Sequence, residues 1–148
     1  MDAVIFDCDG VLIDSETIAH EVELEAMTRL GLFFDGDAFK ARFQGLAVRD
    51  WGAALDEDHR AQLGRPLPAG VIDSISAEIT RRVLGDIRPI AGAVDAARAF
   101  GGLKAIASSS PKVELHGKVR GLGLWDDFDG HVYSGDDVAR GKPAPDLF

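Results

Sequence analysis

Internal disulfides and membrane spans are excluded by what this sequence lacks. Its 148 residues include a single cysteine, Cys8, which has no partner within the chain. Such usage is typical of a reducing compartment. No apolar run approaches the roughly 18 residues that a membrane span needs, and no basic flank of the secretory kind comes before the first strand-like segment. We therefore expect a cytoplasmic protein without membrane contact.

Positive charge is also scarce. The chain carries 16 Lys and Arg against 25 Asp and Glu, a formal net charge of -9. An acidic protein is repelled by polyphosphate and anionic lipid unless it has a local basic patch, and the sequence shows no such patch. A nucleic-acid partner is therefore not expected. The 46% of hydrophobic residues suffices for the core of one compact domain, or of one domain with a small insertion.

Apolar periodicity predicts one strand followed by a helical unit. Residues 3–6 are typical of a buried strand that ends in an acidic turn. Residues 15–84 contain helical patterns and no strand signal, with short helices expected over 37–43 and 49–55 on either side of Gly45. The candidate caps and stops are Asp14 or Ser15, Gly31 and Gly85. The two strongest apolar stripes are Ile18, Val22, Ala26 and Leu30, and Val71, Ile75, Ile79 and Val83.

From Pro89 onward the pattern changes to alternating helices and strands. The expected elements are a helix over 93–100, a strand over 103–107, a helix that opens at Pro111, a strand over 131–134 and the first turn of a helix at Pro145. This order is typical of a parallel α/β sheet that carries an inserted domain. The expected domains are 1–14 with 85–148 for the sheet and 15–84 for the insertion.

Two aspartates follow the first predicted strand. Asp7 and Asp9 lie two positions apart, so both carboxylates can point to one side while Cys8 points away. An acidic turn that binds its own amides is one interpretation. A calcium loop is excluded, because Val11 and Leu12 stand where that pattern needs an oxygen ligand and a glycine.

Two later segments end in groups that suit an anion. Residues 108–110 are all serine and come before a helix start, where backbone amides favour anions; we expect Ser110 to cap that helix and Ser108 to meet a ligand. Lys142 is held on a stiff extended loop by Pro143. The carboxyl ends of parallel strands share one edge, so these groups and the aspartates are expected to converge on one crevice.

The remaining ring-bearing residues are assigned to packing or to the surface. The four histidines show no ligand spacing, because no pair repeats at i, i+4; they are His20, His59, His116 and His131. Trp51, Trp125 and the phenylalanines are expected in the core.

Three stretches resemble the motifs of the haloacid dehalogenase-like hydrolase superfamily. They are residues 4–16 (VIFDCDGVLIDSE), residues 107–111 (ASSSP), and residues 133–138 with 141–146 (YSGDDV and GKPAPD). The resemblance covers essentially the whole chain and is greatest to the branch of sugar-phosphate phosphatases and beta-phosphoglucomutases. It implies a Rossmann-like parallel core with an all-helical cap inserted after the first motif.

The resemblance also implies a chemistry. Asp7 would be the nucleophile that forms an aspartyl-phosphate, and Asp9 would protonate the leaving alkoxide and then activate water. Mg²⁺ would be held by the Asp7 side chain and the Asp9 backbone carbonyl. Ser108, Ser109 and Lys142 would bind the phosphoryl oxygens. A proton-transferring residue at position 9 favours phosphoryl transfer over halide displacement.

Substrate selection is expected from the cap. Residues 43–50 (FQGLAVRD) resemble the cap loop that faces the active site in this branch. Arg49 would clamp a distal phosphate or carboxylate, or it is a solvated arginine at a helix start paired with Asp50. The partner expected on this basis is a small phosphorylated metabolite.

The chain departs from the family pattern after the third motif. Family members continue for two more strands, and the loop after the next strand carries an acidic pair that completes the magnesium site. That strand would lie beside residues 4–6, which are otherwise an apolar edge. We expect a fragment with weak Mg²⁺ affinity and low or no turnover, from a full-length protein that is monomeric and active. A partner chain over the edge and a defective remnant are the alternatives.

Several functions are compatible with these motifs. The leading hypothesis is a magnesium-dependent phosphatase of a small phosphorylated sugar or sugar acid, and the run DSETIA at 14–19 favours the phosphogluconate type. Beta-phosphoglucomutase is the runner-up, although His20 is one position away from the cap-hinge histidine of mutases. A signalling receiver domain is disfavoured, because it has no helical insertion of about 70 residues such as 15–84. A non-catalytic binding module remains open.

Overall fold

The computed structural model describes residues 2–44, 46 and 48–148. The chain divides into two compact units, one made of Met1–Ala19 with Thr80–Phe148 and the other of His20–Ile79. The sequence predicts boundaries at 14/15 and 84/85, so the helical unit of the structure is shorter at both ends. Within the described ranges, no helix is both long and apolar enough to cross a membrane.

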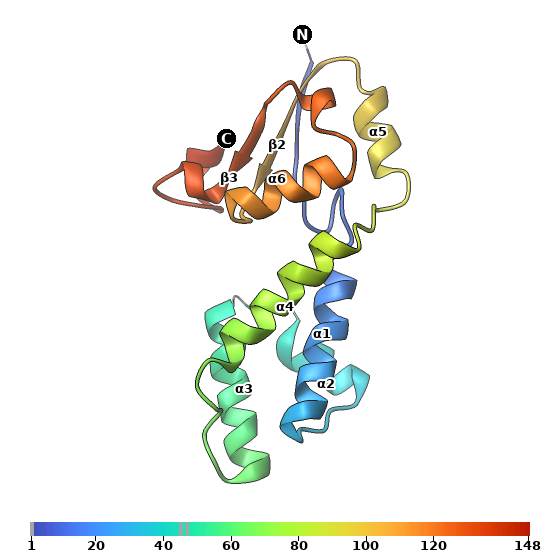
Figure 1. Ribbon diagram of the computed structural model, residues 1–148. Helices are drawn as coiled ribbons and strands as arrows, with labels where there is room; N and C mark the ends of the chain where they lie inside the picture. The colour runs from blue at the N-terminus through green and yellow to red at the C-terminus, as the bar shows by residue number, and fades with distance from the viewer. Residues whose placement is uncertain (1, 45, 47) are drawn as a thin grey trace. The chain divides into compact units, whose positions relative to one another are not determined.

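The first unit is built on a parallel three-stranded sheet in the order β1-β2-β3 (Figure 1). The strands are β1 (Ala3–Phe6), β2 (Leu103–Ser108) and β3 (Val132–Ser134). Phe6 lies opposite Ile106 and Ser108 lies opposite Ser134, so the carboxyl ends of neighbouring strands share one edge of the sheet. The parallel α/β core expected from the sequence is confirmed.

β2 is the central strand and β1 is an edge strand. Ile106 and Ala107 of β2 are buried, whereas Ile5 of β1 is 47% exposed. On the side away from β2, β1 has no partner strand among the residues that the structure describes. The apolar edge expected at residues 4–6 is therefore present in this sheet.

Two whole helices and three short 3-10 turns complete the described part of the first unit. Figure 1 shows α6 running across one face of the sheet, and its Leu115 and Val119 are fully buried. The expected helix at Pro145 is a single 3-10 turn. The elements are α5 (Ala93–Ala99), α6 (Lys112–Gly121), η1 (Asp126–Phe128), η2 (Gly135–Asp137) and η3 (Pro145–Leu147).

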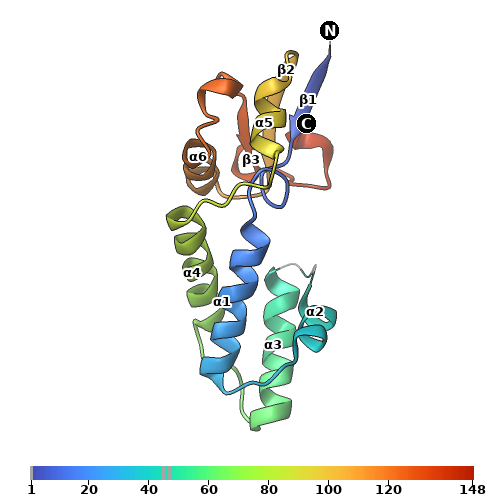
Figure 2. The ribbon, with the colours of Figure 1, turned by 90° about the vertical axis from the view of Figure 1, so that its right-hand side faces the viewer.

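The second unit is helical and has its own core. Its residues come from α1 (Ser15–Leu30), α2 (Gly36–Phe43), α3 (Val48–Leu63) and α4 (Val71–Gly85), of which α1 and α4 each continue into the first unit. Figure 2 shows α1 and α3 side by side, and buried residues of both helices pack into one cluster around Phe39, Phe43 and Trp51.

Local signals account for most helix ends. Asp14 Oδ1 accepts a hydrogen bond from the Thr17 amide at 3.1 Å, so the expected cap of α1 is confirmed. α1 ends before Gly31, whose φ of +80° is a left-handed conformation that glycine adopts without strain. Gly45, expected to separate two helices, lies outside the described residues.

α3 is longer than expected, because it continues past Leu55 to Leu63. Asp56 and Arg60 form an i, i+4 ion pair at 2.8 Å on this extension. His59 is fully buried, and its Nδ1 lies 2.8 Å from the Arg65 carbonyl oxygen. These polar contacts stabilise the last turns of α3, which apolar periodicity alone does not predict.

The assignment of all phenylalanines to the core is wrong. Trp51 is buried, but Phe33 is 84% exposed and Phe148 is 66% exposed. Trp125 is partly buried and lies beside His116, with ring centroids 4.8 Å apart.

Candidate active site

The turn after β1 presents two carboxylates and buries the thiol between them. The Cys8 carbonyl accepts hydrogen bonds from the amides of Leu12 and Ile13 at 2.9 and 3.1 Å, which closes the turn. Cys8 is fully buried, whereas the side chains of Asp7 and Asp9 remain 44% and 32% exposed. The alternation expected from the sequence is therefore observed.

Lys142 joins the end of β1 to the end of β2. Its Nζ lies 2.9 Å from Asp7 Oδ2 and donates to the Ala107 carbonyl oxygen at 2.8 Å. The other carboxylate oxygen, Asp7 Oδ1, accepts from the Cys8 amide at 2.8 Å. The ammonium and the carboxylate predicted to act together are thus in direct contact.

Asp9 is bound by a different set of groups. Its Oδ2 accepts from Ser110 Oγ at 2.6 Å and lies 3.4 Å from Ser108 Oγ. Its Oδ1 accepts from Lys118 Nζ at 2.7 Å. Burial acts to raise the pKa of Asp9, but the hydrogen bonds from Lys118 and Ser110 outweigh it and hold this pKa below its ordinary value.

Lys118 is the residue of this site that the sequence reasoning missed. It lies on α6 and is 2% exposed. Burial alone would lower the pKa of Lys118, but the hydrogen bonds to Asp9 and Glu114 raise it above its ordinary value. The ammonium is therefore charged where it meets Asp9.

The serine segment is arranged differently from the prediction. Ser110 does not cap α6, since Pro111 holds the N-cap position without a side-chain hydrogen bond and the Ser110 hydroxyl binds Asp9 instead. Ser108 Oγ accepts from the Ser110 amide at 3.1 Å and is nearly fully buried. Ser109, a predicted phosphate ligand, is exposed. Its carbonyl oxygen lies so close to Gly135 that a Cβ atom added there would be 3.3 Å from it.

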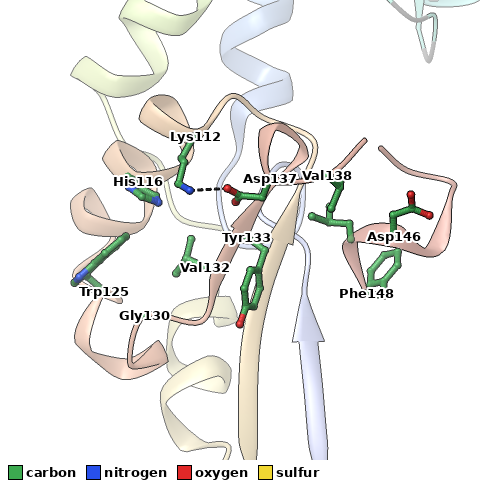
Figure 3. Close-up of a pocket in the computed structure, with 11 residues that line it drawn as sticks. Lys112, His116, Trp125, Gly130, Val132, Tyr133, Asp137, Val138, Asp146 and Phe148 are labelled. Atoms are coloured by element: carbon green, nitrogen blue, oxygen red, sulfur yellow. Dashed lines mark hydrogen bonds and ion pairs between the residues drawn. The ribbon is translucent and has the colours of Figure 1, made fainter. Parts of the chain in front are cut away.

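The serine loop is fastened to the loop after β3. Ser134 Oγ donates to the Ser110 carbonyl oxygen at 2.7 Å. The Lys112 amide donates to Asp136 Oδ2 at 2.8 Å, and Lys112 Nζ pairs with Asp137 Oδ1 at 2.5 Å (Figure 3). The Lys112 hydrogen bond lowers the pKa of Asp137, so this pair is ionic at neutral pH.

A pocket of about 730 Å³ lies beside β3, but it is a separate feature (Figure 3). Its lining includes Trp125, Tyr133 and Phe148, and none of the five site residues predicted at the strand ends. Its charged groups are already paired, Lys112 with Asp137 and Asp146 with Arg140. It therefore offers no free group for the predicted chemistry.

Arg49, the predicted cap residue, is exposed on α3 in the second unit. Its role in binding a substrate stays a prediction. Gly45 and Ala47 of the predicted cap loop lie outside the described residues.

The site offers oxygen donors of the kind that Mg²⁺ binds. Across the part of the chain that is described, no group of three or more His, Cys, Asp and Glu side chains could hold a metal. Mg²⁺, however, is usually held by one or two carboxylates, while water and a substrate phosphate complete its octahedron. The Asp7 carboxylate, which is 44% exposed, fits that pattern.

Comparison with known proteins identifies the family. The family model of haloacid dehalogenase-like hydrolases matches residues 1–148. The chain therefore belongs to the haloacid dehalogenase-like hydrolases, and the resemblance inferred from the three motifs is confirmed.

Individual relatives agree with this assignment. The 6-phosphogluconate phosphatase of Escherichia coli (strain K12) is 26% identical over 147 residues, which are 99% of this chain and 65% of the relative. A haloacid dehalogenase-like protein of unknown function from Agrobacterium tumefaciens is 33% identical, with a TM-score of 0.82 over 100% of this chain and 66% of that one. A putative beta-phosphoglucomutase from Thermotoga maritima is 29% identical, with a TM-score of 0.75 over 99% and 67%.

The chain spans about two thirds of the length of the curated relatives it matches.

Proposed function

We propose that the protein is a phosphatase of small phosphorylated sugars or sugar acids that works through a covalent aspartyl-phosphate at Asp7. The observation that carries this proposal is the meeting of two carboxylates, a hydroxyl and an ammonium at the ends of β1 and β2. Lys142 Nζ lies 2.9 Å from Asp7 Oδ2, and Ser108 Oγ lies 3.4 Å from Asp9 Oδ2. These are groups that phosphoryl transfer requires.

The reaction has two displacements at phosphorus. Asp9 is a carboxylate in the free site and takes up a proton as the anionic phosphate ester binds beside it. A carboxylate oxygen of Asp7 then attacks the phosphorus, the bond to the ester oxygen breaks, and Asp9 gives this proton to the leaving alkoxide. Water then attacks the aspartyl-phosphate and gives a proton to Asp9, the bond between phosphorus and Asp7 oxygen breaks, and phosphate leaves. Asp7 is then a carboxylate again, and Asp9 becomes one when it returns its proton to the solvent after phosphate has left.

Lys142 and Ser108 bind the phosphoryl oxygens in this proposal. The Lys142 ammonium already neutralises Asp7 in the absence of substrate, and it is held in place by the Ala107 carbonyl. Positive charge at this place stabilises the negative charge that spreads over the transferring group. When bound, Mg²⁺ would be held by the Asp7 carboxylate and the Asp9 carbonyl, and it would supply further positive charge to offset the repulsion between carboxylate and phosphate.

The substrate class rests on relatives and on the cap. One relative is named for hydrolysis of 6-phosphogluconate, and Arg49 is an exposed cation on the helical unit that would bind a second anionic group. The proposal includes a monomeric protein of the cytoplasm, in keeping with its single, buried, free thiol.

A second candidate is transfer of the phosphoryl group between sugar carbons. It is favoured by the similarity to a structure described as a putative beta-phosphoglucomutase. A mutase moves phosphate within the sugar, whereas a phosphatase releases it, so a phosphate-release assay separates the two.

The test uses the protein expressed from its complete reading frame. We expect phosphate release from 6-phosphogluconate and other sugar phosphates in the presence of Mg²⁺, and its loss on chelation. Asp7→Asn should lower turnover by about 10³-fold or more, because the amide is isosteric but not nucleophilic. Its melting temperature should stay close to that of the wild type.

Asp2→Asn is the matched control, because it makes the same change at the exposed start of the same strand region. It should keep full turnover. Turnover retained in Asp7→Asn would contradict the covalent mechanism, and a wild type that releases no phosphate from any ester would contradict the phosphatase. Moved but unreleased phosphate would favour the mutase.

A further inference from the structure

Lys118 carries an ammonium group that is buried in the first unit and contacts Asp9 of the candidate site. It lies on α6 between Leu115 and Val119, both fully buried, and is itself 2% exposed. At such a position an apolar side chain would pack without cost, whereas a buried charge is unfavourable unless it is paired and hydrogen-bonded.

Each of the three N–H donors of Lys118 has an acceptor. Its Nζ lies 2.7 Å from Asp9 Oδ1, 3.0 Å from Ser110 Oγ and 2.5 Å from Glu114 Oε1. An ammonium has three donors and no acceptor, so these contacts use its full capacity. The direction of the side chain is therefore fixed.

The partners of Lys118 are held in turn. Glu114 Oε2 accepts from Thr80 Oγ1 of α4 at 3.0 Å, and the Glu114 side chain is only 17% exposed. Ser110 Oγ donates to Asp9 Oδ2 at 2.6 Å. Both carboxylate oxygens of Asp9 are thus held, one by Lys118 and one by Ser110.

Lys118 lies behind Asp9 as seen from solvent. Its side chain is 3% exposed, against 32% for the side chain of Asp9. A ligand that reaches the exposed carboxylate does not meet the ammonium, so Lys118 acts on the reaction through Asp9 and not by binding the phosphoryl group.

Stability alone does not explain this lysine. Replacing buried ion pairs by well-packed apolar residues is often neutral or stabilising in proteins. All three N–H donors of Lys118 bind Asp9 or groups next to it. This arrangement indicates that Lys118 orients the Asp9 carboxylate.

We propose that Lys118 is a positioning residue that orients the Asp9 carboxylate for proton transfer to the leaving oxygen. This inference rests on the proposed phosphatase function, in which Asp9 is the proton-transferring group. It adds a second lysine to the site with a task distinct from that of Lys142, which contacts Asp7.

The test compares two esters with Lys118→Met. An alkyl phosphate such as a sugar phosphate leaves as a strongly basic alkoxide and needs the proton from Asp9, whereas an aryl phosphate such as p-nitrophenyl phosphate leaves as a weakly basic phenolate and needs it little. The quantity measured is kcat/KM, because it reports the steps up to formation of the aspartyl-phosphate and not its hydrolysis.

We expect Lys118→Met to lower kcat/KM for the alkyl ester by on the order of 10- to 100-fold, part of the roughly 10²–10⁴-fold that proton transfer supplies. The aryl ester should lose less than about threefold. A merely structural defect would lower both values in the same ratio. Equal losses, or no loss for the alkyl ester, overturn the inference.

Lys104→Met is the matched control within the same unit. Lys104 is partly buried, donates to the Ala97 carbonyl oxygen at 2.8 Å and lies 5.6 Å from the Phe128 ring centroid. It is at the start of β2, away from the carboxyl ends of the strands. Its variant should leave the ratio of the two kcat/KM values unchanged.

A double variant tests whether Lys118 acts through Asp9. Once Asp9→Asn has removed the proton-transferring group, adding Lys118→Met should cost little more with the alkyl ester. Additive losses overturn the inference. If the methionine variant does not fold, Lys118→Gln takes its place, because its amide keeps hydrogen-bond donors and removes the charge.

A crystal structure of the variant provides a readout other than activity. We expect the Asp9 carboxylate to leave the orientation in which it accepts from Ser110 Oγ at 2.6 Å. An unmoved Asp9 overturns the inference whatever the kinetics. A wild type inactive toward both esters overturns the proposed function, and the inference falls with it; an active wild type with unchanged selectivity in the variant overturns the inference alone.

Discussion

Cys8 shows how strongly one residue can differ from its two neighbours. It lies between Asp7 and Asp9, and its side chain is fully buried. Burial, followed by the negative charge of Asp9, raises the pKa of Cys8 to about 12, although the Lys118 charge acts in the opposite direction. A thiol with this pKa is protonated at neutral pH and is not a nucleophile.

The folded chain should therefore resist alkylation at Cys8. Incubation with iodoacetamide at about pH 8 should leave its intact mass unchanged, while the same chain in concentrated guanidinium chloride gains one adduct. The single thiol makes the mass spectrum unambiguous. Complete labelling of the folded chain, at the rate of the unfolded one, would contradict the buried placement.

At this scale the sequence predicted part of the site. Residues after parallel strands meet at one edge, and this rule placed Asp7, Asp9 and Lys142 correctly. Lys118 was not predicted as a site residue, because a lysine on a helix is usually solvated. A signal was available, since Lys118 lies between Leu115 and Val119 on α6, and both are buried. Ser110 was taken for a helix cap because the sequence does not show which acceptor its hydroxyl meets.

Individual helices and strands followed their apolar patterns closely. The three strands were predicted from short runs rich in apolar residues, and the start of α1 was predicted from Asp14. The last turns of α3 were not, because their stability comes from the Asp56–Arg60 pair and from the buried His59. Such polar contacts depend on the path of the chain after the helix. The apolar periodicity of the helix carries no information about that path.

α1 also carries a carboxyl group in an apolar setting. Burial raises the pKa of Glu23 from its ordinary 4.5 to about 7. In the unfolded chain Glu23 ionises near pH 4.5, so the folded state loses stability as pH rises from about 4.5 to about 7. The loss is of order 1–3 kcal/mol. Glu23→Gln should therefore be more stable than the wild type at pH 8 and equal to it near pH 4.

Urea unfolding at a series of pH values measures this difference. Glu21→Gln, which makes the same change at an exposed position on the same helix, is the control. A gain for Glu23→Gln that is as large at pH 4 as at pH 8 would show that ionisation of Glu23 is not its cause.

The whole molecule consists of two units that each have a core and one tryptophan. Trp51 packs against Phe43 in the helical unit, with ring centroids 5.7 Å apart. Trp125 lies in the sheet unit, where the Arg120 guanidinium is 4.1 Å from its ring centroid. Since the sequence has two tryptophans, each can report one unit.

Unfolding should therefore depart from two-state behaviour. Trp125→Phe leaves Trp51 as the probe, and Trp51→Phe leaves Trp125; we expect their fluorescence midpoints in urea to differ. Adding Phe43→Ala, a large-to-small change in the helical core costing about 3–5 kcal/mol, should shift the Trp51 transition and leave the Trp125 transition in place. Midpoints that move together would show a single cooperative unit.

The bond from Ser134 to the Ser110 carbonyl and the double attachment of Lys112 to η2 tie the serine loop to the chain ahead of Lys142. These contacts restrict the motion of the serine loop relative to the loop that leads to Lys142. A phosphoryl group bound as proposed would therefore meet groups whose spacing is already set, and little ordering entropy would be lost on binding.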